Sequence, residues 1–132
     1  MIFDHDGKVK TINNILIVED DNDVRTTLAE ILGYYGLNVH QASNGKEALE
    51  ILTIIPLPAL IILDAMMPIM DGPAFYKELR MTDGFQDVPV ILFSAVAEKF
   101  QMDGLAGHLK KPADIDDLIE HVSKYCQIEP AV

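Results

Sequence analysis

The chain has one cysteine, few basic residues and no long apolar run, and each shortage excludes a class of protein. Cys126 alone cannot form an intramolecular disulfide, which is typical of the reducing cytoplasm. With 10 Lys and Arg against 21 Asp and Glu, the net charge of −11 opposes binding to nucleic acid or to an anionic membrane surface. A membrane helix needs ~20 apolar residues, and residues 1–14 lack the apolar core of a signal peptide. We therefore expect a cytoplasmic protein that binds neither nucleic acid nor membrane.

The chain does have a regular alternation of short apolar runs and helical patterns. Apolar residues make up 49% of the 132 positions, enough for the core of one domain. The apolar runs predict strands at 14–18, 38–42, 59–63, 88–93 and 107–110. Helical spacing predicts helices at 22–36, 43–52, 74–81 and 114–126, with Ser43 or Asn44 as a cap and Pro73 in a first turn. This alternation indicates a parallel sheet covered by helices on both faces.

Polar side chains stand where four of the predicted strands end. Glu19 and Asp20 follow the first strand, Asp64 the third, Ser94 the fourth and Lys111 the fifth. In parallel α/β sheets, ligands bind beyond the carboxyl ends of the strands, at the point where the strand order reverses. If these strands are neighbours, the five side chains converge on one crevice.

Crowded carboxylates need either raised pKa values or a cation among them. Two carboxylates ~4 Å apart repel each other by roughly 4 kcal/mol at an effective dielectric near 20. The four histidines show no metal-ligand spacing, so the donors are hard oxygens. Such donors favour Mg²⁺, or a similar ion such as Mn²⁺, over zinc.

A magnesium site with a lysine and a hydroxyl beside it suits a phosphoryl group, which an aspartate can accept covalently. Each residue also has an ordinary interpretation. Residues 21–23 cap a helix, Ser94 ends a strand, Lys111 is a solvated cation, and Asp64 alone indicates nothing. Their joint placement at one end of the strands favours the functional interpretation.

The sequence resembles the receiver domain of two-component response regulators. The resemblance rests on "ILIVEDD", "LIILDAMMPIMDG", "VPVILFSA" and "KKP", in family order and at nearly family spacing. It covers residues 14–126, which leaves 1–13 as a lead-in and 127–132 as a tail. It implies a single-domain flavodoxin-like (βα)5 fold with strand order 2-1-3-4-5.

The resemblance also implies roles for the acidic residues. Asp64 would accept the phosphoryl group from a histidine kinase or a phosphotransfer protein. Asp20 and Asp64 would bind Mg²⁺ directly, together with the main-chain carbonyl of Met66, and Glu19 would act through a metal-bound water. Such a domain is not an enzyme beyond its own phosphotransfer and autodephosphorylation.

The phosphoryl group itself would contact residues from the last two strands. Lys111 would pair with it, and Ser94 would move toward it as a switch that changes a partner-binding surface. The Lys111–Pro112 bond is expected to be cis. His108 stands where the family often has Tyr or Phe. It is either a switch ring or a partly buried surface ring.

Other departures from the family affect the output. Glu19 replaces the commoner Asp, and Ala113 a frequent Phe. The segment between Ser94 and Lys111 is at least about a helical turn short, so the fourth helix should be short, displaced or irregular. Most receivers use that face for output and dimerisation. The downstream partner, and the choice between monomer and weak dimer, therefore stay open.

Two other functions compete with the phosphoacceptor. A receiver-like scaffold would bind partners without being phosphorylated, which the intact Asp64 and Lys111 set argues against. A Mg²⁺-dependent aspartyl phosphatase of the haloacid dehalogenase type would need a second acid two residues after Asp64, where Met66 stands. No G-x-G-x-x-G follows the first strand, which argues against a nicotinamide-cofactor enzyme.

Overall fold

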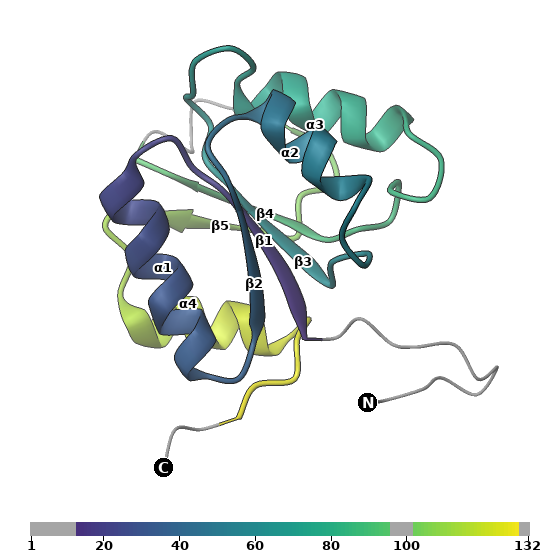
Figure 1. Ribbon diagram of the computed structural model, residues 1–132. Helices are drawn as coiled ribbons and strands as arrows, with labels where there is room; N and C mark the ends of the chain where they lie inside the picture. The colour runs from purple at the N-terminus through teal and green to yellow at the C-terminus, as the bar shows by residue number, and fades with distance from the viewer. Residues whose placement is uncertain (1–12, 96–101, 130–132) are drawn as a thin grey trace, which may run out of the picture.

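The computed structural model describes residues 13–95 and 102–129, and Figure 1 shows its layers. Within these ranges, strands and helices alternate as the sequence predicts, except that the last two strands have no described helix between them. They are β1 (Asn14–Val18), α1 (Asn22–Tyr34), β2 (Asn38–Ala42), α2 (Gly45–Leu52), β3 (Leu60–Leu63), α3 (Gly72–Met81), β4 (Val90–Ser94), β5 (Gly107–Lys110) and α4 (Ile115–Ser123). No helix in the described ranges is long and apolar enough to cross a bilayer.

The five strands form one parallel sheet in the order β2-β1-β3-β4-β5, which confirms the predicted fold class. Strand order reverses between β1 and β3, where Val18 pairs with Leu63. All four residues of β3, and four of the five in β1, are buried because helices cover both faces. The outer strands β2 and β5 are more polar. The sheet therefore delivers the ends of β1 and β3 to a common edge.

Each face of the sheet has its own core. Helices α2 and α3 cover one face, and α1 and α4 cover the other (Figure 1). Because side chains alternate along a strand, Leu16 and Val18 belong to the core under α2 and α3. Ile15 and Ile17 belong to the core under α1 and α4, which also contains Cys126. Cys126 is therefore a packing residue, and burial raises the pKa of its thiol to about 11.

Short polar side chains cap the amino ends of the helices and so fix where each helix begins. The Asp21 carboxylate accepts hydrogen bonds from the Asp23 and Val24 N–H groups, so the predicted capping of α1 is correct. Of the two candidate caps for α2, the structure uses Asn44. These caps set the helices close behind the strand ends.

The connection from β4 to β5 differs from the other crossovers. Its described residues, 95 and 102–106, contain no helix, and the expected short fourth helix falls largely on residues 96–101, outside the described ranges. Met102 and Leu105 pack against the core under α2 and α3. The Tyr76 hydroxyl on α3 donates a 2.6 Å hydrogen bond to the Asp103 carbonyl. Side-chain contacts thus hold this connection against α3.

Residues 127–129 of the expected tail lie against the turn between α1 and β2. The Glu129 N–H donates to the Tyr35 carbonyl at 2.7 Å, and Ile128 packs against the core under α1 and α4. A Cβ at Gly36, which has a φ of +88°, would lie 3.3 Å from the Glu129 Cβ. This stretch is therefore part of the packed domain.

The hydrogen bond from the Tyr76 hydroxyl to the β4–β5 connection provides a test of this packing. We expect Tyr76→Phe to lower the free energy of unfolding by about 1 kcal/mol, because the Asp103 carbonyl loses its donor. Tyr34→Phe is the matched control, since Tyr34 is exposed and its loss should be close to neutral. Urea denaturation measures both. Equal effects of the two substitutions would contradict a role for the hydrogen bond.

Candidate functional site

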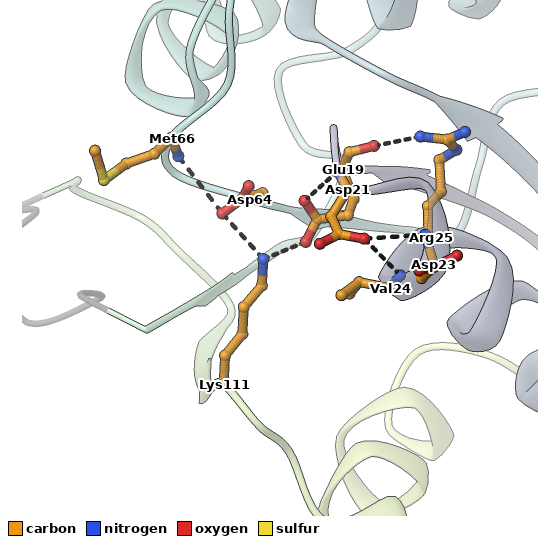
Figure 2. Close-up of polar contacts among 8 residues, drawn as sticks. All are labelled: Glu19, Asp21, Asp23, Val24, Arg25, Asp64, Met66 and Lys111. Atoms are coloured by element: carbon orange, nitrogen blue, oxygen red, sulfur yellow. Dashed lines mark hydrogen bonds and ion pairs between the residues drawn. The ribbon is translucent and has the colours of Figure 1, made fainter.

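Glu19 directly follows β1 and is almost completely buried. Its N–H donates to the Ala42 carbonyl at 3.0 Å, which extends the strand geometry by one residue. Its carboxylate accepts hydrogen bonds from the Asp21 N–H at 3.1 Å and from Lys111 (Figure 2). Two donors thus fix the direction of this buried carboxylate.

Asp64 follows β3 and lies beside Glu19. The Asp64 N–H donates to the Val18 carbonyl at 2.9 Å, so sheet hydrogen bonding continues up to the aspartate. Its side chain is buried, and its Oδ1 lies 3.5 Å from the Lys111 Nζ and 3.5 Å from the Met66 N (Figure 2). Asp20, which is exposed, completes a cluster in which carboxylate oxygens of Glu19, Asp20 and Asp64 lie within 4.8 Å of one another.

Lys111 reaches the cluster from the residue after β5. Its ammonium group pairs with both Glu19 and Asp64 and lies 5.3 Å from the centre of the Phe93 ring. Burial lowers the pKa of Lys111, but the two carboxylates outweigh burial and raise it overall. Lys111 therefore stays a cation that faces the acids.

Burial makes the charged form of the Glu19 and Asp64 carboxyl groups less favourable. Burial raises the pKa of Glu19 to about 7, despite the opposing hydrogen bonds from Lys111 and Asp21. Burial also raises the pKa of Asp64, by more than Glu19 and Lys111 lower it. One ammonium group does not compensate for the burial and mutual repulsion of these carboxylates. Their hard oxygens fit a Mg²⁺ or Mn²⁺ ion, which would supply the missing positive charge.

The loop after Asp64 is fastened at several points. The Gly72 N–H donates to the Ala65 carbonyl at 2.9 Å, and the Gly45 N–H of α2 donates to the Met70 carbonyl at 3.0 Å. A Cβ at Gly72 would lie 2.4 Å from the Asp64 carbonyl oxygen, so only glycine allows α3 to start this close to the acidic residue. These contacts leave the loop little freedom.

Within this loop Ile69 has a φ of +70°, which is unusual for a β-branched residue. The Met70 N–H donates to the Pro68 carbonyl at 2.7 Å, which makes Ile69 the central residue of a γ-turn. Its side chain is 78% exposed. The anchored ends of the loop thus impose backbone strain at Ile69.

The remaining predicted residues lie at the same edge or near it. Ser94 is buried at the end of β4, and its carbonyl accepts from the Lys111 N–H at 3.4 Å. Met66 helps to line a hollow of about 460 Å³ beside Asp20. The Lys111–Pro112 bond is cis. His108 lies on β5 and is exposed, whereas the sequence suggested a partly buried ring as one possibility.

Sequence reasoning overlooked Arg25, which shapes the site. Arg25 on α1 donates from Nη1 to the Glu19 carbonyl at 2.8 Å. Only the helical pattern around Arg25 was visible in the sequence. The signal that could have indicated its contact with Glu19 is its position, six residues after Glu19 and about one turn into the predicted helix.

The family model for the response regulator receiver domain matches residues 15–123. The chain therefore belongs to this family and is a receiver domain of a two-component system. Fold, sheet order and the placement of the acidic cluster all agree with this assignment.

Curated relatives and a solved structure support the same family. Sporulation initiation phosphotransferase F of Bacillus subtilis is 34% identical over 87% of this chain and 94% of its own length. Regulatory protein AtoC of Escherichia coli is 35% identical over 89% of this chain, which spans only 26% of that protein. The receiver domain of a sensor histidine kinase from Pseudomonas aeruginosa has a TM-score of 0.76 at 25% identity, over 86% of this chain and 96% of that one. It was solved with magnesium coordinated in its active site cleft.

The strained position in the loop predicts a stabilising substitution. We expect Ile69→Gly to raise the free energy of unfolding by up to about 1 kcal/mol, because glycine adopts a positive φ without a Cβ clash. Ile54→Gly is the matched control: Ile54 is 82% exposed but has no positive φ, so glycine should only add entropy to the unfolded chain. Urea denaturation measures both. A loss of stability in both variants would contradict strain at Ile69.

The raised pKa of Glu19 predicts a pH-dependent stability in EDTA. Between about pH 4.5 and 7 the folded chain holds a proton that the unfolded chain releases, so the free energy of unfolding should fall as pH rises. Glu19→Gln should flatten this slope. Bound Mg²⁺ should increase the free energy of unfolding by about 1.4 kcal/mol for each tenfold excess of the ion over its Kd. The resulting rise in melting temperature should be largest at high pH, where the carboxylates are ionised. Identical slopes in the variant and the unaltered chain, or no shift with millimolar Mg²⁺, would contradict the assignment.

Proposed function

We propose that Asp64 is the phosphoacceptor of this receiver domain. The observation that carries the proposal is the position of its carboxylate. Asp64 directly follows the central strand β3, is buried, faces the Lys111 ammonium group at 3.5 Å and shares a cluster with Glu19 and Asp20. A nucleophile fixed by the sheet needs little reorientation before it attacks a bound phosphoryl group.

Mg²⁺ or Mn²⁺ supports this chemistry by neutralising charge on the transferring phosphoryl oxygens when it is bound. Asp20 and Asp64 would hold the ion directly together with the Met66 main-chain carbonyl, and Glu19 would hold it through a water. The support for this set is the 4.8 Å cluster of carboxylate oxygens and the position of Met66 in the adjoining hollow. The magnesium ion in the P. aeruginosa receiver domain agrees with it.

The transfer step is a displacement at phosphorus. An Asp64 carboxylate oxygen forms the new O–P bond while the N–P bond of a phosphohistidine breaks, and the imidazole leaves with the bonding pair. Lys111 donates to the phosphoryl oxygens as a point charge. The donor is a histidine kinase or a phosphotransfer protein. Autodephosphorylation is hydrolysis at the same site: a water oxygen forms a bond to phosphorus while the bond from Asp64 to phosphorus breaks, which releases inorganic phosphate and regenerates the carboxylate.

The phosphoryl group then acts as a switch. It brings negative charge to Lys111, and the Ser94 hydroxyl moves to bond it, which shifts the connection that follows β4. His108 on β5 is the candidate for a second ring that moves. A downstream protein would read the changed surface. We propose that the protein is cytoplasmic and either monomeric or weakly dimeric. It would act by binding other proteins, and it would bind neither nucleic acid nor membrane.

Phosphorylation by a small donor tests the acceptor. With Mg²⁺ and radiolabelled acetyl phosphate, the unaltered chain should take up label that hydroxylamine releases, since hydroxylamine cleaves acyl phosphates. Asp64→Asn should take up none. Asp87→Asn is the matched control, because Asp87 is an exposed acid before the amino end of β4. EDTA should abolish labelling.

The outcomes separate the competing functions. Equal labelling of Asp64→Asn and the unaltered chain would disprove the acceptor assignment. An unlabelled wild-type chain that still binds Mg²⁺ would favour a scaffold. Repeated turnover of phosphate monoesters would favour the phosphatase.

A further inference from the structure

The turn between β1 and α1 carries two of the three clustered acids, Glu19 and Asp20. The register between β1 and β2 ends where Val18 pairs with Ala42. The Glu19 N–H still donates to the Ala42 carbonyl at 3.0 Å. The Glu19 carbonyl comes after this N–H in the chain and lies beyond the last paired residues of β1 and β2. Because Glu19 is buried, this carbonyl needs a partner from elsewhere.

Arg25 on α1 supplies that partner. Its Nη1 donates to the Glu19 carbonyl at 2.8 Å, as Figure 2 shows. Its Nη2 donates to the Asn22 side-chain oxygen at 2.7 Å. Two acceptors therefore hold the planar guanidinium in one orientation, which a lysine ammonium group could not reproduce.

The contacts of Glu19 then fix one whole residue. Strand β2 holds its N–H, Arg25 holds its carbonyl, and Lys111 and the Asp21 N–H hold its carboxylate. The peptide group that joins Glu19 to Asp20 therefore has one orientation. Asp20 is exposed and lies in the bend after the strand, so this peptide group sets the direction in which its side chain leaves the chain.

We propose that Arg25 is a positioning residue for the cation site. By fixing the Glu19 carbonyl it keeps the Asp20 carboxylate in the cluster with Glu19 and Asp64, without touching the ion itself. The inference rests on the proposed function, in which Asp20 and Asp64 bind a divalent cation. Groups that orient metal ligands from behind typically affect metal affinity about 10- to 100-fold.

The sign of the effect distinguishes positioning from charge. Arg25 carries the same sign of charge as the ion, so its removal by itself would reduce repulsion and tighten cation binding. Loss of a positioning contact would weaken binding, because the Asp20 carboxylate would then sample other directions. The two explanations predict opposite changes in Kd.

Titration with Mn²⁺, followed by the electron paramagnetic resonance signal of the free ion, measures this Kd without any phosphotransfer. Arg25→Ala should raise the Kd about tenfold, and Arg25→Lys should restore only part of the affinity. Asn22→Ala keeps the arginine but removes its second acceptor, and should raise the Kd by less. Thr26→Ala is the matched control. It removes a hydrogen bond to the Asn22 carbonyl in the same turn of α1 and should leave the Kd unchanged.

Melting temperatures in EDTA show that each variant is folded at the titration temperature. An unchanged or lower Kd in both Arg25→Ala and Asn22→Ala would overturn the role of Arg25. An equal loss of affinity in Thr26→Ala would overturn it too, because a general loosening of α1 would then explain the effect. Failure of the unaltered chain to bind Mn²⁺ would instead overturn the proposed cation site, and this inference with it.

Discussion

The crowding of carboxylates at the carboxyl edge of the sheet is the constraint on which the rest of the structure depends. Glu19 and Asp64 are buried side by side, and burial raises both pKa values because a low-dielectric edge disfavours charge. Lys111 supplies one positive charge, which leaves the cluster open to a divalent cation. A bound cation or phosphoryl group would change the balance of charge at this poorly screened edge.

The sheet is rigid where the chemistry needs rigidity. Strands β1 and β3 are buried on both faces, and sheet hydrogen bonds continue to the Glu19 and Asp64 N–H groups themselves. Beyond the strands, side-chain and glycine contacts take over: Arg25 holds the first turn, and Gly72 lets α3 start against the Asp64 carbonyl. Preorganisation of the acids is therefore shared between strand pairing and a few specific contacts outside the strands.

One residue close to the site has a backbone conformation that its side chain disfavours. Ile69 is a β-branched residue with a positive φ, exposed in the loop that follows the proposed acceptor. The connection after β4 is fastened to α3 by Tyr76 and by apolar packing of Met102 and Leu105. The loop that contains Ile69 follows the end of β3, where a phosphoryl group would act. Departures from local preference are expected to gather at such places.

The sequence by itself determined the element order, the parallel sheet and the residues at the strand ends, because strand and helix periodicities and caps such as Asp21 are local signals. It also indicated Asp64 and Lys111 as partners, since parallel strands bring their carboxyl ends to one edge. Only the tertiary structure decided that Arg25 reaches the Glu19 carbonyl and that Gly72 touches the Asp64 carbonyl. Such contacts depend on the angle at which a helix leaves its strand, which no periodicity records. Burial, and with it the raised pKa of Glu19, likewise exists only once both faces of the sheet are covered.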